Sequence, residues 1–442
     1  MTDVAIVGGG LAGLAAARTL RTAGIRCTLF EATDTLGGRV KSERYDDIIV
    51  DKGFQLLNSW YPAVKELLTP GEYSALNMRS FEAGIQSMTK QGPAFLGDPI
   101  RSPRIFAGIF KPSMRSAISI RDLMALRKWL GAELSHRTSL ELRKISDSRR
   151  NKDLSMAQSL DRSGVTRQIR SAVMDPLMRA FLLDTDGETS SIYAKWVFAT
   201  LLRGSATIPA QGMGDLSSLM SRVSGVTVEL DTRVTRLKVV ETTDQATGYV
   251  DVELGEHGRT ERFSYVILAV PQAEEAALLG RNLSAMRGQD TFWFISDEPV
   301  CERGVITVDG TGDTPIASIA EVTAVAPDYA PKRHLVQGTV AYGGSPRALQ
   351  ESDVPDEQTM RRYMGQLLGV DSAAWELVTR HHIPNAHPVL SPRRATRAAN
   401  EDVITRSHIA LAGIQHANPT IDGALRSGQR AAKRVVELLG AS

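Results

Sequence analysis

Three glycines near the beginning of the chain have the spacing of a phosphate-binding turn. Gly8-Gly9-Gly10-Leu11-Ala12-Gly13 fits G-x-G-x-x-G and lies between an apolar segment, residues 4–7, and a run rich in alanine and leucine, residues 11–23. In such a turn the first glycine allows the tight bend, the second lets a pyrophosphate approach the backbone, and the third lets helix and strand pack closely. The phosphate then lies at the positive end of the helix.

A carboxylate follows where a dinucleotide site needs one. Glu31 ends the next apolar segment, residues 27–31. It stands about 20 residues after the turn, where a carboxylate can accept hydrogen bonds from ribose hydroxyls. The pattern predicts a βαβ unit that binds a dinucleotide, whereas a glycine turn without a ligand is the alternative for the motif taken alone.

The rest of the chain separates this unit from similar elements far along the sequence. Residues 60–200 are predicted to be largely helical. Strands are predicted at residues 46–51, 226–230, 234–240, 249–254, 262–270, 292–295, 304–308, 335–342 and 409–412. A helix is predicted at 421–439, because apolar residues recur there at helical spacing on one face. The elements that bind the cofactor are therefore expected to be discontinuous, with two insertions between them.

A second motif follows Glu31 at fixed spacing. Gly37-Gly38-Arg39 completes the pattern E-x5-G-G-R, and Asp51-Lys52-Gly53-Phe54-Gln55 comes next. With these residues the chain resembles the flavin amine oxidase superfamily, which includes phytoene desaturase-like and protoporphyrinogen oxidase-like enzymes. The resemblance implies one non-covalent FAD, with the two glycines and Arg39 along its diphosphate and ribityl chain. A guanidinium suits a diphosphate because it donates two parallel hydrogen bonds.

The resemblance continues in the family's order to the end of the chain. Its further segments are Pro209-Ala210-Gln211-Gly212-Met213-Gly214, Thr232-Arg233-Val234, residues 265–271 ending at Pro271, and residues 419–428. It implies that the backbone of Val234 reaches the adenine. Together with the glycine turn, it implies these cofactor-binding residues: Gly8, Gly10, Ala12, Gly13, Glu31, Gly37, Gly38, Arg39, Gly53, Phe54, Gln55, Val234, Pro271, Gly413, Thr420, Ile421 and Ala424.

The last of these segments has a physical role and one departure. Thr420 is expected to cap the final helix, whose positive end would face the flavin N1/C2 carbonyl and stabilise the reduced ring. Relatives usually have an acidic residue after the glycine that corresponds to Gly413, but this chain has Ile414. We expect weaker FAD binding, or a ribityl contact from Gln415 or His416 instead.

The residues that would act on a substrate are not identified by the sequence. No nucleophile–base pair and no metal-binding pattern is visible, and His381, His382 and His387 are expected to be solvated or structural. The paired aromatic residues and the lysine that true amine oxidases place at the flavin are missing, which disfavours simple amine oxidation. Gln55, Asn58, Trp60 and Tyr61 could line the substrate side or belong to the core.

Composition limits the partners. The net charge of +2 gives no global field for nucleic acid, and two cysteines in 442 residues suit a reducing compartment. With no signal-like amino end and no long apolar run, we expect a cytoplasmic protein that binds a hydrophobic small molecule. The segment 101–150 is basic with interleaved apolar residues, and either contacts an anionic membrane surface peripherally or covers the substrate as a solvated lid.

The expected fold is a two-domain α/β architecture. A Rossmann-like FAD domain of the glutathione-reductase type is assembled from residues 1–75, 205–275 and 395–442. A mixed α+β substrate domain with a helical cap is assembled from residues 76–204 and 276–394.

The leading functional hypothesis is an FAD-dependent dehydrogenase, desaturase or oxidase that takes a hydride from a C–H bond of a hydrophobic substrate. Isoprenoid or carotenoid-like compounds are favoured over porphyrin-like ones. The alternatives are an amine or amino-acid oxidase, and a non-catalytic flavin-fold binding protein. The sequence does not identify the electron acceptor or the oligomeric state.

Overall fold

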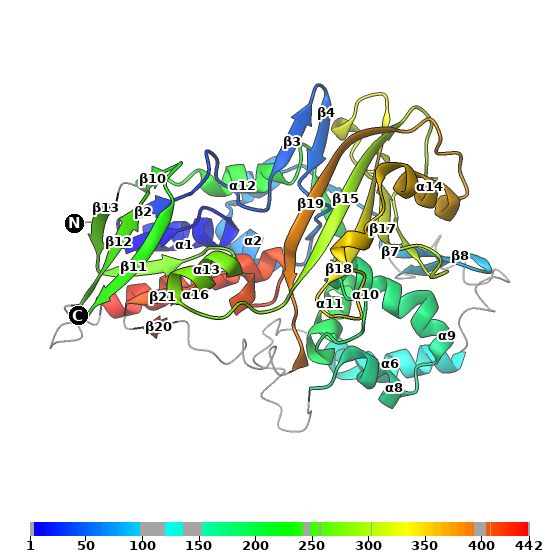
Figure 1. Ribbon diagram of the computed structural model, residues 1–442, viewed down its shortest axis with the longest axis horizontal. Helices are drawn as coiled ribbons and strands as arrows, with labels where there is room; N and C mark the ends of the chain where they lie inside the picture. Colours follow the sequence, from blue (N-terminus) through cyan, green and yellow to red (C-terminus); the bar gives the residue numbers. More distant parts are fainter. Residues whose placement is uncertain are drawn as a thin grey trace.

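A six-stranded sheet includes β1 (Val4–Val7) and β2 (Cys27–Phe30), the two strands beside the glycine turn (Figure 1). The computed structural model describes residues 4–97, 120–135, 153–241, 248–255, 258–301, 303–392, 404–406 and 408–440. The strands of this sheet, in spatial order, are β10 (Thr227–Glu229), β2 (Cys27–Phe30), β1 (Val4–Val7), β14 (Tyr265–Leu268), β21 (Ile409–Leu411) and β20 (Ile404–Arg406). All neighbouring strands are parallel except β20 and β21.

The central strands are apolar throughout because both faces of the sheet are covered. β1, β2 and β14 are buried at every position, as expected for parallel strands between two layers. Val4 and Ile6 belong to the large core cluster with α1 (Leu11–Thr22) and α16 (Ile421–Gly440). Ala5 and Val7 pack on the opposite face. The alternation follows from the period of two along a strand.

The opposite face is covered by a small antiparallel sheet. It consists of β11 (Val234–Val240), β12 (Tyr249–Leu254) and β13 (Arg259–Phe263), with α13 (Gln272–Leu279) beside it. Val252 and Phe263 pack there against Val7, Phe30 and Leu268. α12 (Gly214–Ser221) lies on the side of α1, with which it is in contact.

A second sheet of seven strands forms the other half of the molecule (Figure 1). Its order is β19 (Glu376–Pro388), β15 (Met286–Ser296), β18 (His334–Gly343), β17 (Ile316–Glu321), β16 (Ile306–Asp309), β7 (Gly84–Thr89) and β8 (Gly92–Gly97). Only β16 and β7 pair in parallel. α14 (Glu357–Leu368) packs on this sheet through Met360 and Met364 against Phe292 and Phe294.

A group of helices lies below this sheet in Figure 1. Its members are α6 (Ile120–Ser135), α8 (Met156–Ser163), α9 (Arg167–Ile169), a π-helical segment (Arg170–Met174), α10 (Asp175–Leu182) and α11 (Ser191–Arg203). Trp129 of α6 packs edge-on against Phe198 of α11, and its indole N–H donates to Ser159 Oγ at 3.0 Å. None of the helices in the described ranges is long and apolar enough to span a bilayer.

Short elements connect the two halves. They are the hairpin β3 (Ser42–Tyr45) and β4 (Ile48–Asp51), the helices α2 (Pro62–Leu67) and α3 (Pro70–Ala75), and the sheet of β5 (Leu57–Asn58), β9 (Ala206–Pro209) and β6 (Met78–Ser80). The loop after β21 and the start of α16 lie between the halves (Figure 1).

Three predicted elements are wrong in detail. The strand expected at 46–51 starts at Ile48, because Asp46 has a φ of 53° and makes the turn of a hairpin. The strand expected at 262–270 is two strands, β13 and β14, which separate at Ser264 and belong to different sheets. The region 60–200 is less helical than predicted, since β7 and β8 form a hairpin within it. The final helix and β11 have the predicted extents to within one residue.

The six-stranded sheet draws its strands from residues 4–30, 227–268 and 404–411. The domain boundaries proposed from the sequence stay a prediction.

Replacement of Gly428 by alanine tests the contact between α1 and α16. A Cβ atom on Gly428 would overlap the carbonyl oxygen of Ala12 in α1. We expect Gly428→Ala to lower the free energy of unfolding by about 1–3 kcal/mol, the usual cost of overpacking. Chemical denaturation measures it. Gly440→Ala, in the same helix with open space around it, is the control and should not destabilise the protein. Equal stability of both variants would contradict the contact.

Candidate functional site

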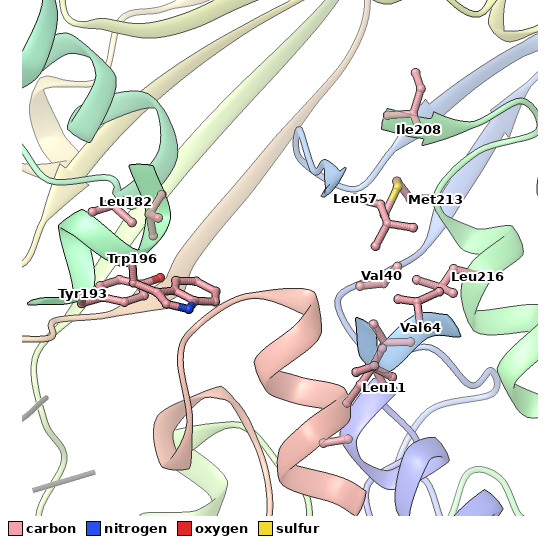
Figure 2. Packing of buried hydrophobic residues seen from close by; sticks show 14 of the residues in the cluster. Leu11, Val40, Leu57, Val64, Leu182, Tyr193, Trp196, Ile208, Met213 and Leu216 are labelled. Atoms are coloured by element: carbon pink, nitrogen blue, oxygen red, sulfur yellow. The ribbon is translucent and has the colours of Figure 1, made fainter. Parts of the chain in front are cut away.

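A cavity of about 880 Å³ lies between the two halves of the molecule. One part of its wall comes from the turn after β1, the end of β2, residues 37–41, the start of β11 and the start of α16. The other part comes from α10, α11 and the second sheet. Figure 2 shows Tyr193 and Trp196 of α11 on one side, and Leu11, Val40, Leu57 and Val64 on the other, with the turn that begins α16 between them.

The glycine turn forms one end of this wall. Gly8 has a φ of 102°, and Cβ atoms on Gly8 and Gly13 would collide with Ala269 and Gly8. Gly10 differs, because an added Cβ would have only the Cα of Gly38 within 4 Å, at 3.9 Å. Gly8, Gly10 and Ala12 line the cavity, whereas Gly13 does not. Since no side chain caps the start of α1, its free N–H groups are available to an anion.

Glu31 lines the cavity but is already bonded to the protein. Its carboxylate accepts hydrogen bonds from Gly9 N at 2.8 Å, Thr33 N at 3.0 Å and Thr33 Oγ1 at 2.8 Å. A carboxylate has about four acceptor positions, so one remains for a ligand hydroxyl. Glu31 therefore also holds the glycine turn against the end of β2, a role the sequence did not reveal.

Gly37, Gly38 and Arg39 complete the same part of the wall. Both glycines have positive φ, and Gly37 N donates to Gly9 O at 2.9 Å, which joins this segment to the glycine turn. Arg39 Nη1 donates to Ala386 O at 3.0 Å. Burial lowers the pKa of the Arg39 guanidinium, and the charge of Glu274 opposes that shift. Arg39 thus lines the cavity while the backbone of β19 holds its guanidinium.

Some residues of the segment after β4 line the cavity, and others pack beside it. Phe54 and Gln55 line the cavity, and Gln55 Nε2 donates to Arg39 O at 3.0 Å. Gly53 does not line it; its N–H donates to His381 Nδ1 at 3.1 Å, and a Cβ there would lie 2.6 Å from Gln289 Nε2. Of the further candidates, Asn58 and Tyr61 line the cavity and Trp60 does not. Of the seventeen residues predicted to bind the cofactor, Gly13 and Gly53 are the two that lie outside the cavity wall.

The beginning of α16 faces the cavity. Thr420 Oγ1 accepts from Gly423 N at 3.1 Å, so Thr420 caps the helix as expected. Thr420, Ile421 and Ala424 line the cavity, as do Gly413, Val234 and Pro271. A side chain on Gly423 would overlap Asn418. The positive end of a second helix is thereby directed at the cavity.

A carboxylate that the sequence analysis missed contacts the two residues that follow Ile414. Glu275 Oε2 accepts from Gln415 Nε2 and from His416 Nε2, both at 2.7 Å. Burial acts to raise the pKa of the Glu275 carboxyl, but the hydrogen bonds from His416 and Gln415 and the charges of His416 and Arg281 together lower it. Gln415 Nε2 also donates to Val270 O, so its carbonyl Oε1 remains as an acceptor. Gln415 lines the cavity, whereas His416 and Glu275 do not.

The residues present fit FAD. Two helix ends can bind the negative charge of the diphosphate and of the reduced flavin ring, and Arg39 adds a fixed cation. Gly10 leaves open space where a pyrophosphate would lie against the backbone. Glu31 and Gln415 offer acceptors for sugar hydroxyls at two places along the wall.

The three histidines near the end of the second sheet have different surroundings. His381 bonds Gly53 N and Glu43, and His382 lies between Asp290 and Glu351, so both are structural. His387 lines the cavity. In the described ranges no three His, Cys, Asp or Glu side chains come together as a metal site.

Known proteins share this architecture. The family model for flavin containing amine oxidoreductase matches residues 11–436. A 65-residue segment, 15% of this chain, is 40% identical to protoporphyrinogen oxidase 2, chloroplastic/mitochondrial, of Arabidopsis thaliana and spans only 13% of that protein. Putrescine oxidase bound to putrescine superposes with a TM-score of 0.70 at 17% identity, over 99% of both chains. A fatty acid isomerase from P. acnes superposes at 0.69 and 15%, over 98% of both. The predicted α/β fold class is confirmed.

Substitution of Gly10 tests the position of the cofactor. Gly10 has a φ of −75°, which any residue adopts, so Gly10→Leu should fold. Its side chain should occupy the part of the cavity beside residue 10. We expect the variant to lose most of its bound flavin, measured as flavin absorbance per protein, with an unchanged far-ultraviolet circular dichroism spectrum. Gly71→Leu, at a helix position with open space around it, is the control. Unchanged flavin content in Gly10→Leu would place the cofactor elsewhere.

Asp51 predicts a pH dependence of stability. Burial raises its pKa from 3.8 to about 6, although hydrogen bonds from Ser42, Met213 and Tyr329 oppose the shift. Between these pH values the unfolded chain loses the proton first, so the free energy of unfolding falls as pH rises from about 4 to 7. The shift corresponds to about 3 kcal/mol at most.

The amide in Asp51→Asn cannot titrate. The decrease of its denaturation midpoint with rising pH should therefore be smaller than in the wild type by the contribution of Asp51. Asp297→Asn, whose side chain is exposed, is the control and should keep it. The same pH slope in wild type and Asp51→Asn would contradict the assignment.

Proposed function

The chain belongs to the flavin-containing amine oxidoreductase family, and from this premise we propose that it oxidises a C–H bond of an uncharged, apolar organic substrate. It is an FAD-dependent oxidoreductase. When bound, FAD supplies a two-electron acceptor at N5, and the protein supplies binding, orientation and exclusion of water. The substrate class is argued from the wall of the cavity.

The observation that carries the proposal is the lining opposite the cofactor residues. We call this part of the cavity the chamber. Its apolar residues come from α10, α11, β9, β16 and β19 and from the loops beside them. They are Ala180, Phe181, Leu183, Val197, Leu201, Ala206, Ile306, Ile383 and Ala386. The polar residues that accompany them, from the same elements or their neighbours, include Gln289, Ser318, Tyr193, Thr200 and His387. Such a lining favours an apolar molecule fixed by a few polar contacts.

Charge separates this proposal from amine oxidation. The charged residues of the described wall are Glu31, Arg39, Lys41, Lys52, Arg233 and Glu274, and none of them comes from the elements that form the chamber. An ammonium group in the chamber would therefore have no carboxylate partner among the described residues, and burial of an unpaired charge is costly. A porphyrin would likewise lack cations for its propionates. Isoprenoid or carotenoid-like substrates fit better than either.

The names of similar proteins do not decide the substrate. The relatives named above act on a porphyrinogen, on putrescine or on a fatty acid according to their names. The two solved structures share fold alone with this chain at these identities, and the Arabidopsis protein matches over a small part of its length. The composition of the chamber is therefore the stronger argument.

Peripheral contact with an anionic membrane surface remains a second part of the proposal. Most of the segment 101–150 on which it rests lies outside the described residues. Within it, α6 exposes Arg121, Arg127 and Lys128, and Met124 is 62% exposed. This agrees with a basic amphipathic surface but equally with a solvated lid. The expected cytoplasmic location and the expected absence of nucleic-acid partners stay predictions.

Anaerobic reduction of the flavin tests the substrate class. We expect acyclic isoprenoids and carotenoid precursors to bleach the flavin absorbance of the wild-type holoenzyme, whereas putrescine, cyclohexylamine and amino acids should not. Val197→Asp places a carboxylate in the chamber and should raise KM for an active isoprenoid at least about tenfold, with flavin content unchanged. Val228→Asp, on the exposed strand β10, is the matched control. Bleaching or peroxide release with amines alone would replace this proposal by amine oxidation.

A further inference from the structure

Two buried polar atoms in the chamber wall have no partner. Tyr193 Oη and His387 Nε2 accept or donate no hydrogen bond within the described structure, and the side chains are 0% and 7% exposed. Both residues line the cavity, and the centroids of their rings are 6.2 Å apart. Buried polar groups are almost always satisfied, so a pair left open beside a cavity indicates a ligand.

The tautomer of His387 follows from its one hydrogen bond. Nδ1 lies 2.9 Å from the carbonyl oxygen of Pro388, and because a carbonyl only accepts, Nδ1 carries the proton. Nε2 is then a bare acceptor. Burial, followed by the positive charge of Arg287, lowers the pKa of His387 to about 3, so the imidazole stays neutral at physiological pH.

Tyr193 supplies the complementary donor. It lies in the first turn of α11, where its N–H donates to the capping hydroxyl of Ser190, and its ring stacks on Trp196 at 6.0 Å and 16°. Burial raises the pKa of Tyr193 well above its usual value, so its hydroxyl keeps the proton. In Figure 2 the rings of Tyr193 and Trp196 lie beside the loop that leads into α16.

One buried ion pair holds both residues in place. Arg287 pairs in register with His387 across β15 and β19, and its guanidinium lies 3.1 Å from Asp184 and 2.8 Å from Thr189 Oγ1. Asp184 in turn accepts from Thr189 N, in the loop that leads into α11. The strand that carries His387 and the helix that carries Tyr193 are therefore tied to the same support.

From this arrangement we propose that Tyr193 and His387 bind one hydroxyl group of the apolar substrate. A hydroxyl can donate to Nε2 of the imidazole and accept from the phenol at the same time. A carboxylate has no proton for the imidazole, and an ammonium cannot accept from the phenol and is repelled by Arg287 and Arg39. The substrate class named above is thereby narrowed to hydroxylated apolar molecules, so this inference rests on the proposed function.

A pair of probes that differ by one hydroxyl tests the inference. Geraniol and 2,6-dimethylocta-2,6-diene are titrated into the holoenzyme, and the perturbation of the flavin absorption spectrum gives each Kd. We expect geraniol to bind the wild type roughly fivefold to tenfold more tightly than the hydrocarbon, the range for one or two net hydrogen bonds. Tyr193→Phe and His387→Leu should each bring this ratio close to one without changing the Kd of the hydrocarbon.

Further variants separate recognition from a structural role. His387→Gln keeps an acceptor and should restore part of the preference. The double variant Tyr193→Phe/His387→Leu should show no further loss, because both residues serve one hydroxyl. Two control variants remove a phenol hydroxyl and an imidazole outside the chamber. Tyr363→Phe lies on α14, and His408→Leu removes a buried histidine that also has an unpartnered Nε2 but does not line the cavity. Both should keep the wild-type ratio.

The outcomes distinguish the two proposals. Equal Kd values for both probes in the wild type would overturn this inference. The Tyr193–His387 pair would then bind only water, and the proposal of an apolar substrate would be unaffected. If neither probe perturbs the flavin, the apolar substrate class fails and this inference fails with it. Loss of bound FAD in Tyr193→Phe and His387→Leu would assign the pair to the cofactor and overturn the inference.

Discussion

The whole site depends on close backbone packing among β1, α1 and α16. Gly13 lets α1 approach the turn at Gly8, and Gly428 lets α16 approach the backbone of Ala12. These two approaches place the ends of both helices at the same cavity, with Gly10 open to it. A larger residue at either contact would move a helix end by an ångström or more and remove the alignment of its N–H groups. The arrangement of the helix ends at the cavity therefore depends on glycines, which have no side chain to keep the backbones apart.

This part of the wall was accessible to sequence reasoning because each residue has a local cause, and its assignment to the cofactor stays a prediction. A glycine in a tight turn, a carboxylate at the end of a strand and a threonine before a helix each leave a signal within a few neighbours. Fifteen of the seventeen residues predicted for the cofactor line the cavity, and the two others, Gly13 and Gly53, are required for packing beside it. The same reasoning misplaced strand ends wherever tertiary pairing decided them, as at Ser264, where the chain passes from one sheet to another.

The chamber could not be predicted in the same way. Tyr193 and His387 are separated by 194 positions in the sequence and meet only because β15, β19 and α11 share the support at Arg287. Glu275 escaped notice for a similar reason, since it lies on α13 and acts on Gln415 across 140 positions. A histidine in an extended segment reads as solvated until the fold shows which face of the strand is enclosed. Long-range contacts of this kind have no signature in a single sequence.

The hydrogen bond from Arg39 to Ala386 O joins the two regions. Arg39 belongs to the segment expected along the diphosphate, and Ala386 precedes the histidine of the chamber. If a bound anion displaces the guanidinium, the strand next to His387 loses or shifts this contact, and linkage then requires that nucleotide and substrate change each other's affinity by the same factor. Under that condition, substrate affinities of this protein are to be compared only between preparations with the same flavin occupancy.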